Sequence, residues 1–443
     1  MIVFSPNAIC VNPQHNGSNK MKRVMFVLLF ILILPVTAQA SFSGLHGFIE
    51  NDIGIKLSND TTKRDNYNMF EQRLQLKTNY YAQGENVWAR KGLAVNFRGD
   101  FTVDEYYSGK TDFDLRELNL SLSPFRWMDL KLGRQVLTWG TGDYLFINDM
   151  FPKDYESFFI GRDDEYLKKP SDAIKASFYP KLANIDFIVI PYFTPNTIAT
   201  GDRLSFFDSF QGGIAGTNSD RQIISPPFQM SNNEYTLRAY RNFGSNEAAF
   251  YYFHGFDKNP RSYKDEARRQ LYYEPVDVYG ASLQGPFAKG IGNVEFGYIR
   301  SRDDANGTNR TVENSWLKLM TGYSKDLGND LKIGFQYLVE ERLNQGAYDD
   351  NLMPSDYRWD EFRHLITNRI TKLFKNQTVN VTLFTFYSPS DKDGYVRPSV
   401  SYDITDQWKV TAGMNLPWGE DDQTEFGQMK HNKNVYVRVK YSF

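Results

Sequence analysis

Basic side chains recur at every second position in segments whose intervening residues are apolar. Near the end of the chain, Arg438 and Lys440 alternate with Val437, Val439 and Tyr441. Because successive side chains of a β-strand point to opposite faces, such a segment predicts one polar and one apolar face. The basic residues that we place on polar faces are Arg73, Lys77, Arg98, Lys131, Lys175, Arg238, Lys318, Lys332, Arg363, Arg369, Arg397, Lys409, Arg438 and Lys440.

Acidic residues on the same faces are fewer, about one for every two basic residues, which predicts a wall that concentrates anions. They are Glu71, Asp100, Glu117, Asp186, Glu234, Glu295 and Asp403. The alternative is that the basic residues pair with nearby acids, as Arg98 with Asp100, and simply tolerate water.

The connection at about 137 to 170 is unusually apolar for a loop. Its residues Leu145, Phe146, Ile147, Met150, Phe151, Phe158, Phe159 and Ile160 all require burial. In a wide barrel, a loop can achieve this by folding inward against the wall. It would then carry charged residues to a constriction, namely Asp149, Lys153, Asp154, Arg162 and Asp163. The alternative is a loop that caps the rim of the barrel.

Nothing in the chain predicts a catalytic centre, a metal site or a cofactor. Outside the first forty residues the histidines are His46, His254, His364 and His431, with no Gly-x-Ser-x-Gly motif or metal-ligand spacing nearby. Cys10 is the sole cysteine. Adjacent aspartates at 163–164, 303–304, 349–350 and 421–422 predict solvated extracellular loops, because none forms a complete cation-binding motif. A hydrolase site assembled across strands stays open as an alternative.

The first forty residues predict export. Lys20, Lys22 and Arg23 precede an apolar run from 24 to 36, and Ala38 and Ala40 fit a cleavage site before Ser41. Residues before 21 look like an upstream start, so we interpret 1–40 as a leader with a signal peptide that is removed. The chain has 51 basic and 53 acidic residues. Three of the basic ones lie in this leader, and the net negative remainder argues against a nucleic-acid partner.

An unusual composition points to a membrane barrel. Aromatic residues make up 16% of the chain, yet its mean hydropathy is −0.53. In a lipid-spanning barrel one side chain in two faces hydrocarbon and the other a wet lumen, so the average is polar although one face is apolar. Leu93, Val95 and Phe97 should accordingly face lipid, and Arg98 water. After the leader no apolar segment is long enough to span a membrane as a helix.

Repeated alternation predicts about eighteen antiparallel strands in an all-β, up-and-down transmembrane barrel. We place them near 43–55, 69–80, 87–100, 111–124, 126–136, 171–180, 183–193, 233–241, 246–256, 277–286, 289–300, 314–324, 329–339, 361–370, 377–387, 394–402, 406–415 and 432–442. Short and long connections alternate, which predicts short periplasmic turns, long extracellular loops and both termini in the periplasm. Aromatic residues near strand ends fit interface girdles: Tyr80, Trp88, Trp127, Tyr179, Trp408 and Tyr441.

Two sequence features resemble known outer-membrane proteins. The ending Tyr441-Ser442-Phe443 resembles their assembly signal, which implies recognition of Phe443 by the barrel-assembly machinery. The segment 132–135 (Leu-Gly-Arg-Gln), followed by Gly140 and, after a long loop, by 171–173 (Ser-Asp-Ala), resembles alginate-export-type and related outer-membrane channels. That resemblance implies an eighteen-stranded barrel that passes anionic polymers or small solutes.

These observations predict one barrel domain, residues 41–443, in the cell outer membrane. We expect a porin-like channel for small anionic or polar solutes, with an exporter of an anionic polysaccharide and an outer-membrane hydrolase as alternatives. Its surroundings would be outer-membrane lipid and lipopolysaccharide. Whether copies associate is not determined, because a trimer interface and a lipid face are both apolar.

Overall fold

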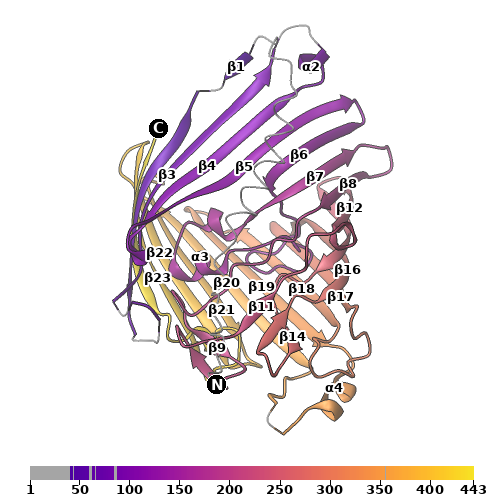
Figure 1. Cartoon of the computed structure of the whole chain (residues 1–443). Helices are drawn as coiled ribbons and strands as arrows, with labels where there is room; N and C mark the ends of the chain where they lie inside the picture. Colours follow the sequence, from indigo (N-terminus) through magenta and orange to yellow (C-terminus); the bar gives the residue numbers. More distant parts are fainter. Residues whose placement is uncertain (1–39, 43, 59–61, 65, 84–86, 355) are drawn as a thin grey trace, which may run out of the picture.

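The computed structural model describes residues 40–443 except 43, 59–61, 65, 84–86 and 355. The expected leader lies outside the described residues, apart from Ala40. Eighteen antiparallel strands form the wall of a closed barrel (Figure 1). They are β2 (His46–Lys56), β3 (Tyr67–Ala82), β4 (Ala94–Asp104), β5 (Lys110–Phe125), β6 (Met128–Val136), β7 (Pro170–Phe178), β8 (Asn184–Ile190), β12 (Glu234–Phe243), β13 (Asn246–Phe256), β16 (Pro275–Phe287), β17 (Gly290–Ser301), β18 (Trp316–Asp326), β19 (Leu331–Arg342), β20 (Phe362–Phe374), β21 (Val379–Ser388), β22 (Asp393–Asp403), β23 (Trp408–Gly419) and β24 (Asn434–Ser442).

Each wall strand pairs with its neighbour in sequence, and β24 pairs with β2 to close the barrel. The pairing at this seam runs from Phe48 opposite Ser442 to Lys56 opposite Asn434. At its end, the backbone N–H of Phe443 donates to the carbonyl of Gly47 at 3.0 Å. The strand number and the up-and-down order predicted from the sequence are confirmed.

The remaining elements of the described chain lie at the strand ends or inside the barrel. Short strands are β1 (Ala40–Phe42), β9 (Phe206–Asp208), β10 (Gly213–Ala215), β11 (Gln222–Ile224), β14 (Ser262–Asp265) and β15 (Gln270–Tyr272). Helices are α2 (Val87–Arg90), α3 (Tyr155–Ile160), α4 (Gln345–Asn351), η1 (Glu105–Tyr107), η2 (Asp164–Leu167), η3 (Met230–Asn232) and η4 (Gly427–Met429). None of these helices is long and apolar enough to cross a membrane.

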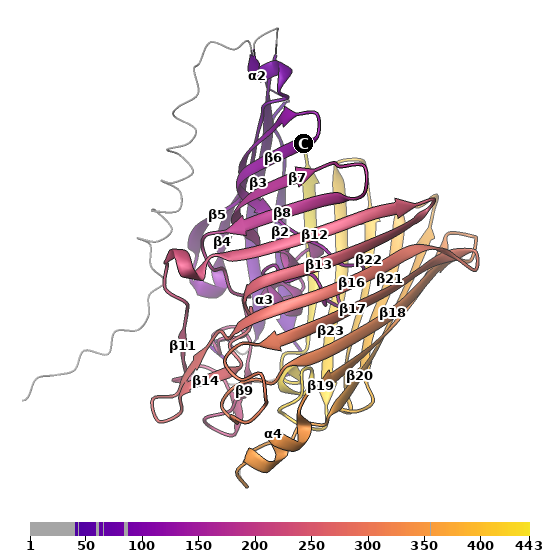
Figure 2. The same cartoon turned by 90° about the vertical axis from the view of Figure 1, so that its right-hand side faces the viewer.

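Connection lengths separate the two ends of the barrel. Short turns, α2 and the C-terminus lie at one end, which we call the turn end (Figure 1). The connections that contain β9, β11, β14 and α4 lie at the other, the loop end (Figures 1 and 2). The alternation has exceptions, because the loop-end connections 105–109 and 389–392 are also short.

The strand predicted from residue 87 begins only at Ala94, and this part of the prediction was wrong. Residues Val87–Arg90 form one helical turn instead, and the backbone N–H of Leu93 donates to Trp88 at 3.1 Å. Gly92 lies between them with a φ of +62°, a left-handed conformation that glycine adopts without strain. Leu93 is therefore buried ahead of the strand, and its side chain does not share the exposed outer face.

The alternation of faces is clear on β2. Ile53 is 47% exposed on the outer face, whereas Glu50 and Asp52 are 1% exposed on the inner face. Because Glu50 and Asp52 are buried and do not face a water-filled lumen, other parts of the chain must cover this inner face. In this barrel, connections that fold into the lumen supply most of that cover.

Candidate functional site

The connection between β6 and β7, residues 137–169, lies inside the barrel, and we call it the inner segment. Figure 1 shows its helix α3 enclosed by the wall strands. Asp154 caps α3 by accepting from the backbone N–H of Ser157 at 2.9 Å, and Gly161 ends the helix with a φ of +93°. The segment contacts wall strands on several sides of the lumen, which positions it across the barrel.

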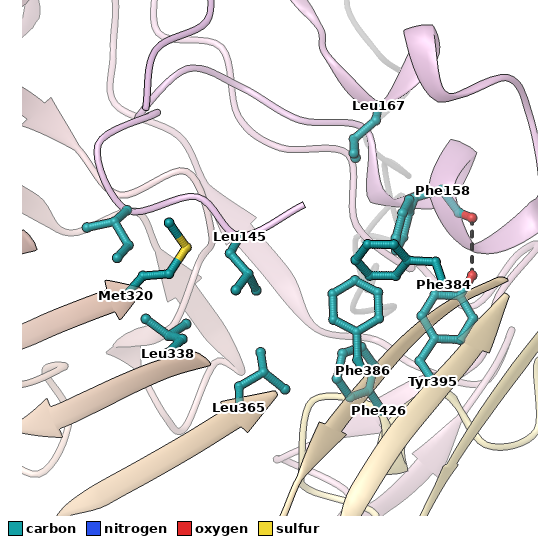
Figure 3. Close-up of a cluster of buried hydrophobic side chains, with 11 residues drawn as sticks. Leu145, Phe158, Leu167, Met320, Leu338, Leu365, Phe384, Phe386, Tyr395 and Phe426 are labelled. Atoms are coloured by element: carbon teal, nitrogen blue, oxygen red, sulfur yellow. Dashed lines mark hydrogen bonds between the residues drawn. The ribbon is translucent and has the colours of Figure 1, made fainter. Parts of the chain in front are cut away.

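Apolar residues of the inner segment pack on one sector of the wall. Leu145, Phe158 and Leu167 join a buried cluster whose wall members come from β18 to β22 (Figure 3). The wall members are Met320, Leu338, Leu365, Phe384, Phe386 and Tyr395. Phe426, from the connection between β23 and β24, completes the cluster. The Tyr395 hydroxyl donates to the Phe158 carbonyl at 3.4 Å. The burial predicted for Leu145 and Phe158 therefore comes from the inner wall.

A single wall carboxylate, Glu295 of β17, holds the start of the inner segment. Its Oε2 accepts from the backbone N–H of Thr141 at 2.6 Å and from the Thr141 hydroxyl at 2.9 Å. Its Oε1 accepts from the backbone N–H and the side-chain amide of Asn148, at 2.9 and 3.0 Å. Glu295 is fully buried. These four bonds to one ion fix the turn from 141 to 148 against the wall.

Wall arginines hold acidic residues of the inner segment at other positions. Arg369 of β20 binds Asp143 through two bonds, at 2.5 and 2.7 Å. Arg397 of β22 binds Asp164 at 3.1 Å. The aspartates of this segment thus neutralise basic residues that would otherwise face the lumen.

Asp163 connects the inner segment to the barrel seam. Arg438 and Lys440 of β24 approach its Oδ2 at 3.1 and 3.6 Å. Although burial acts to raise the pKa of Asp163, these two cations hold it below its ordinary value. The structure thus corrects the expectation that Asp163 and Asp164 belong to a solvated extracellular loop.

Glu71 of β3 is a buried carboxylate that accepts from three arginines. Arg162 of the inner segment bonds to both of its oxygens. Arg203 approaches it at 2.8 Å and Arg73 at 3.3 Å. Burial acts to lower the pKa of Arg162, but Glu71 holds it well above its ordinary value. The guanidinium groups therefore stay charged and held at this carboxylate.

Arg203 belongs to the connection between β8 and β12, which also enters the barrel. It is 1% exposed and bonds to Asp104 at the end of β4 and to Glu156 of α3. Its guanidinium lies 4.8 Å from the centre of the Tyr106 ring. Sequence reasoning missed Arg203, because it lies in a long connection without strand periodicity. Two connections therefore fill the loop-end half of the lumen together.

The other predicted constriction residues lie inside the inner segment. Asp149 and Lys153 form an ion pair of 2.9 Å, and Lys153 is only 2% exposed. Burial lowers the pKa of Lys153, although Asp149 acts in the opposite direction. This pair stabilises the segment from within, and its charges do not reach the segment surface.

Most basic residues predicted for the lumen are ion-paired. Those with an acidic partner are Arg73, Arg98, Lys175, Arg238, Lys318, Arg363, Arg369, Arg397, Lys409, Arg438 and Lys440. The predicted list of inward acids was incomplete, since Glu50, Asp52 and Glu340 also lie on the inner face and pair with these bases. Arg98 pairs with Glu117 at 3.0 Å, whereas Asp100 pairs with Arg73.

Three predicted lumen lysines form no ion pair within the described part of the chain: Lys77, Lys131 and Lys332. All three lie toward the turn end, away from the filled half of the lumen. Lys131 stands directly opposite Lys175 across β6 and β7, and Lys77 directly opposite Arg98 across β3 and β4. A hollow of about 310 Å³ adjoins this region, lined by Lys131, Lys175 and the hydroxyls of Ser121 and Ser177 among others. Basic residues therefore gather near the turn end, together with Asp129, which also lines the hollow, and Asp186, which pairs with Lys175.

Residues of the alginate-export-type motif lie on the wall between β5, β6 and β7. Arg134 pairs with Asp172 at 3.4 Å and also donates to the backbone carbonyl of Leu115. Gln135 is buried and donates to the carbonyl of Ala173 at 3.2 Å. Arg134, Gln135 and Asp172 thus join neighbouring wall strands, whereas Gly140 lies in the inner segment.

The described histidines form no triad geometry. His254 bonds to Asp277 at 2.7 Å on the outer face, and His364 bonds to Tyr337 at 2.7 Å. No hydrogen bond between a His ring and a Ser or Thr hydroxyl occurs among residues that the structure describes. In the same described ranges, no three His, Cys, Asp or Glu residues are grouped as a metal site.

Comparisons with known proteins place the fold. No protein-family model matches the chain, and no curated protein matches its sequence. OccAB3 of Acinetobacter baumannii has a TM-score of 0.53 at 11% identity, over 90% of this chain and 98% of that chain. OccK11 (OpdR) of Pseudomonas aeruginosa has a TM-score of 0.52 at 10% identity, over 90% and 95%. These likenesses establish a porin-type β-barrel fold, and the resemblance to alginate-export-type channels stays a prediction.

Proposed function

We propose that this barrel is a passive outer-membrane channel for small solutes, with a preference for anions. The inner segment would be its constriction, and the turn end would open to the periplasm. An apolar outer face around a polar interior supports a membrane location, because only a closed barrel leaves no unpaired strand edge in lipid. Turn-end aromatic residues such as Trp127 and Trp408, 53% and 44% exposed, support a membrane boundary there.

The observation that carries the anion preference is the set of like charges placed directly opposite each other near the turn end. Lys131 faces Lys175, and Lys77 faces Arg98, on the inner wall. Directly opposed like charges destabilise a sheet. Arg98 and Lys175 are offset by Glu117 and Asp186, whereas Lys77 and Lys131 have no acidic partner among the described residues. An anion that enters between the opposed basic residues gains favourable electrostatic energy in a narrow, weakly screened space.

Selectivity would therefore arise at the turn end and not at the inner-segment arginines. Arg369, Arg397 and Arg438 already have acidic partners, so their net field in the lumen is small. Lys77 and Lys131 have none among the described residues, whereas Lys332 stands opposite Asp326 across β18 and β19, so we attribute the selectivity to Lys77 and Lys131. Small solutes are favoured over a polymer, because two connections pack across the loop-end half of the lumen.

The position of Phe443 supports a proposal about the assembly partner. Phe443 is 42% exposed and ends the strand that closes the barrel, so it is available until closure and remains on the outer surface. We propose that it serves as the recognition residue for the barrel-assembly machinery. Deleting Phe443 should lower the amount of folded barrel in the membrane without changing the conductance of the molecules that assemble.

The anion preference is tested by reversing the charges of Lys77 and Lys131, of which Lys131 lines the hollow. Lys77→Glu with Lys131→Glu breaks no described ion pair, so the fold should tolerate it. In planar bilayers under a salt gradient, the reversal potential should move toward cation selectivity, most at low salt where screening is weak. Lys264→Glu, in the loop-end strand β14, makes the same charge change outside the lumen and should leave the potential unchanged.

Two results would overturn parts of the proposal. A double variant with normal conductance and an unchanged reversal potential would remove the lysines as the source of selectivity. If the wild-type barrel inserts into bilayers but shows no conductance, the proposed channel function is wrong.

A further inference from the structure

A chain of charged and polar side chains lies on the outer surface of β13, β16 and β17. Nη1 of Arg302 lies 3.2 Å from Nε2 of His254, and Nδ1 of His254 lies 2.7 Å from Oδ1 of Asp277. Arg300 approaches the other oxygen of Asp277 at 3.7 Å. We call these four residues the outer arginine patch. Neither the channel function nor the barrel closure uses it.

The strand register shows that the patch faces outward. His254 stands opposite Asp277, and Asp277 stands opposite Arg300. The alternate residues Phe253 and Val278 instead form a buried cluster with Met150 of the inner segment, so they point into the barrel. Figure 2 shows β13, β16 and β17 side by side on the face turned toward the viewer.

A row of tyrosines gives the depth of the patch. Tyr252, Tyr279 and Tyr298 occupy the next outward positions toward the turn end, with ring centres 5.2 and 6.2 Å apart. Beyond them the outward residues are apolar, as with Phe250 at 68% exposure and Phe296 at 40%. Such a row marks the boundary between hydrocarbon and headgroups. The patch lies just beyond it, toward the loop end.

The chemistry of the patch fits a phosphate. Arg300 is 48% exposed, and among the described residues its one ion pair is the long contact with Asp277, so most of its donors point to the surroundings of the barrel. Arg302 contacts Nε2 of His254 through Nη1 at 3.2 Å and donates to the carbonyl of Gly255 through Nη2 at 3.0 Å. The patch therefore holds two guanidinium groups against one carboxylate. Guanidinium groups bind phosphate through paired, charge-assisted hydrogen bonds.

We propose that the outer arginine patch binds a phosphate group of lipid A, the membrane anchor of lipopolysaccharide. The inference rests on the proposed outer-membrane location, in which the loop end faces the lipopolysaccharide leaflet. At that depth the phosphates of lipid A meet the two arginines, and its acyl chains lie along the apolar surface below the tyrosine row. Asp277 and His254 position the guanidinium groups.

Native mass spectrometry of the full barrel in detergent tests the site directly. The probes are lipid A with its phosphates and the same lipid after dephosphorylation. The wild-type barrel should retain phosphorylated lipid A, and Arg300→Gln with Arg302→Gln should weaken that binding more than tenfold. Arg241→Gln is the matched control, since Arg241 lies on the outward face of β12 but at the turn end, where it donates to Leu182 at 3.0 Å.

Equal binding by the wild type and the double variant would overturn the proposal, as would equal retention of dephosphorylated lipid. So would equal weakening in Arg241→Gln, which would indicate a general charge effect. If the wild type forms a multimer, and the double variant is monomeric but retains lipid A as well as the wild type, the patch binds a second copy of the chain and not lipid A. Heat-resistant gel migration verifies that each variant is folded. Conductance is not part of this readout, so failure of the channel proposal would appear separately.

Discussion

Replacing Glu295 by Gln should loosen the inner segment without damaging the wall. The Glu295 side chain takes no part in strand pairing, because β17 pairs with β16 and β18 through its backbone. The amide keeps one acceptor oxygen for two of the four bonds from Thr141 and Asn148. The NH₂ group replaces the other oxygen and cannot accept. The backbone N–H that donated to that oxygen, of Thr141 or of Asn148, is therefore buried without an acceptor.

The cost follows from those four bonds. An unsatisfied buried N–H costs about 1–3 kcal/mol, and loss of the ionic charge weakens the remaining bonds, so the total is about 3 kcal/mol. Since every 1.4 kcal/mol is a factor of ten, the released state of this turn should become roughly a hundredfold more populated. Thr141→Ala removes the hydroxyl bond to Glu295 and the bond that this hydroxyl accepts from the Asn293 amide at 3.0 Å. The Asn293 amide keeps its bond to the Thr141 carbonyl, so the effect should be smaller, about 1 kcal/mol.

Single-channel recordings measure this directly. Glu295→Gln should show frequent transitions to a higher conductance, and Thr141→Ala rarer ones, while both barrels keep heat-resistant migration on gels. Glu266→Gln is the control, because it removes an exposed ion pair with Arg310 of 2.5 Å in the loop-end connections. If Glu295→Gln conducts with the level and noise of the wild type, the inner segment is not the constriction.

Three further predictions concern the same segment and the wall around it. Replacing Leu145 to Phe159 by a short Gly/Ser linker should raise conductance and relax size exclusion; unchanged size exclusion would place the constriction elsewhere. The lowered pKa of Asp163 means that its contribution to holding the segment is complete above about pH 4 and is lost as pH falls through the lowered value. Conductance recorded against pH should therefore be steady to about pH 4 and rise only in stronger acid, and a rise near neutral pH would contradict this assignment. Single cysteines at Val95 and Arg98 should differ toward a membrane-impermeant thiol reagent, with only position 98 labelled; equal labelling would mean a register shift of one residue.

Much of the wall could be predicted from the sequence because its signal is local. Alternation of apolar and polar residues repeats in every strand, and strand β13 was predicted with the bounds that the structure has, 246 to 256. The error at Val87–Arg90 is also local in origin. That stretch contains apolar residues, but the chain changes direction at Gly92, before the strand begins. A helical turn of four residues is too short to show the periodicity of a helix in the sequence.

The partners within the lumen could not be predicted, because they are brought together across the barrel. The apolar residues of the inner segment indicated burial, but nothing in the sequence joins Thr141 to Glu295 or Asp163 to Arg438. Glu340 was missed because the predicted strand ended one residue before it, whereas β19 extends to Arg342. These omissions made the lumen look more basic than the pairing in the structure supports.

The structure divides the basic residues of the lumen into two groups with different expected effects on the channel, one on gating and one on ion selectivity. Arg369 and Arg397 pair with the inner-segment aspartates Asp143 and Asp164, which are 44% and 51% exposed, so breaking either pair costs about 0.2–1 kcal/mol. Neutralising them should therefore change how the segment is held and how the channel opens. Lys77 and Lys131 form no ion pair with described residues, so removing their charge should cost the fold little stability. It should change the ion selectivity of the channel instead. Variants of the paired arginines should change gating but leave the reversal potential near its wild-type value. Variants of the unpaired lysines should change the reversal potential but leave gating near its wild-type behaviour.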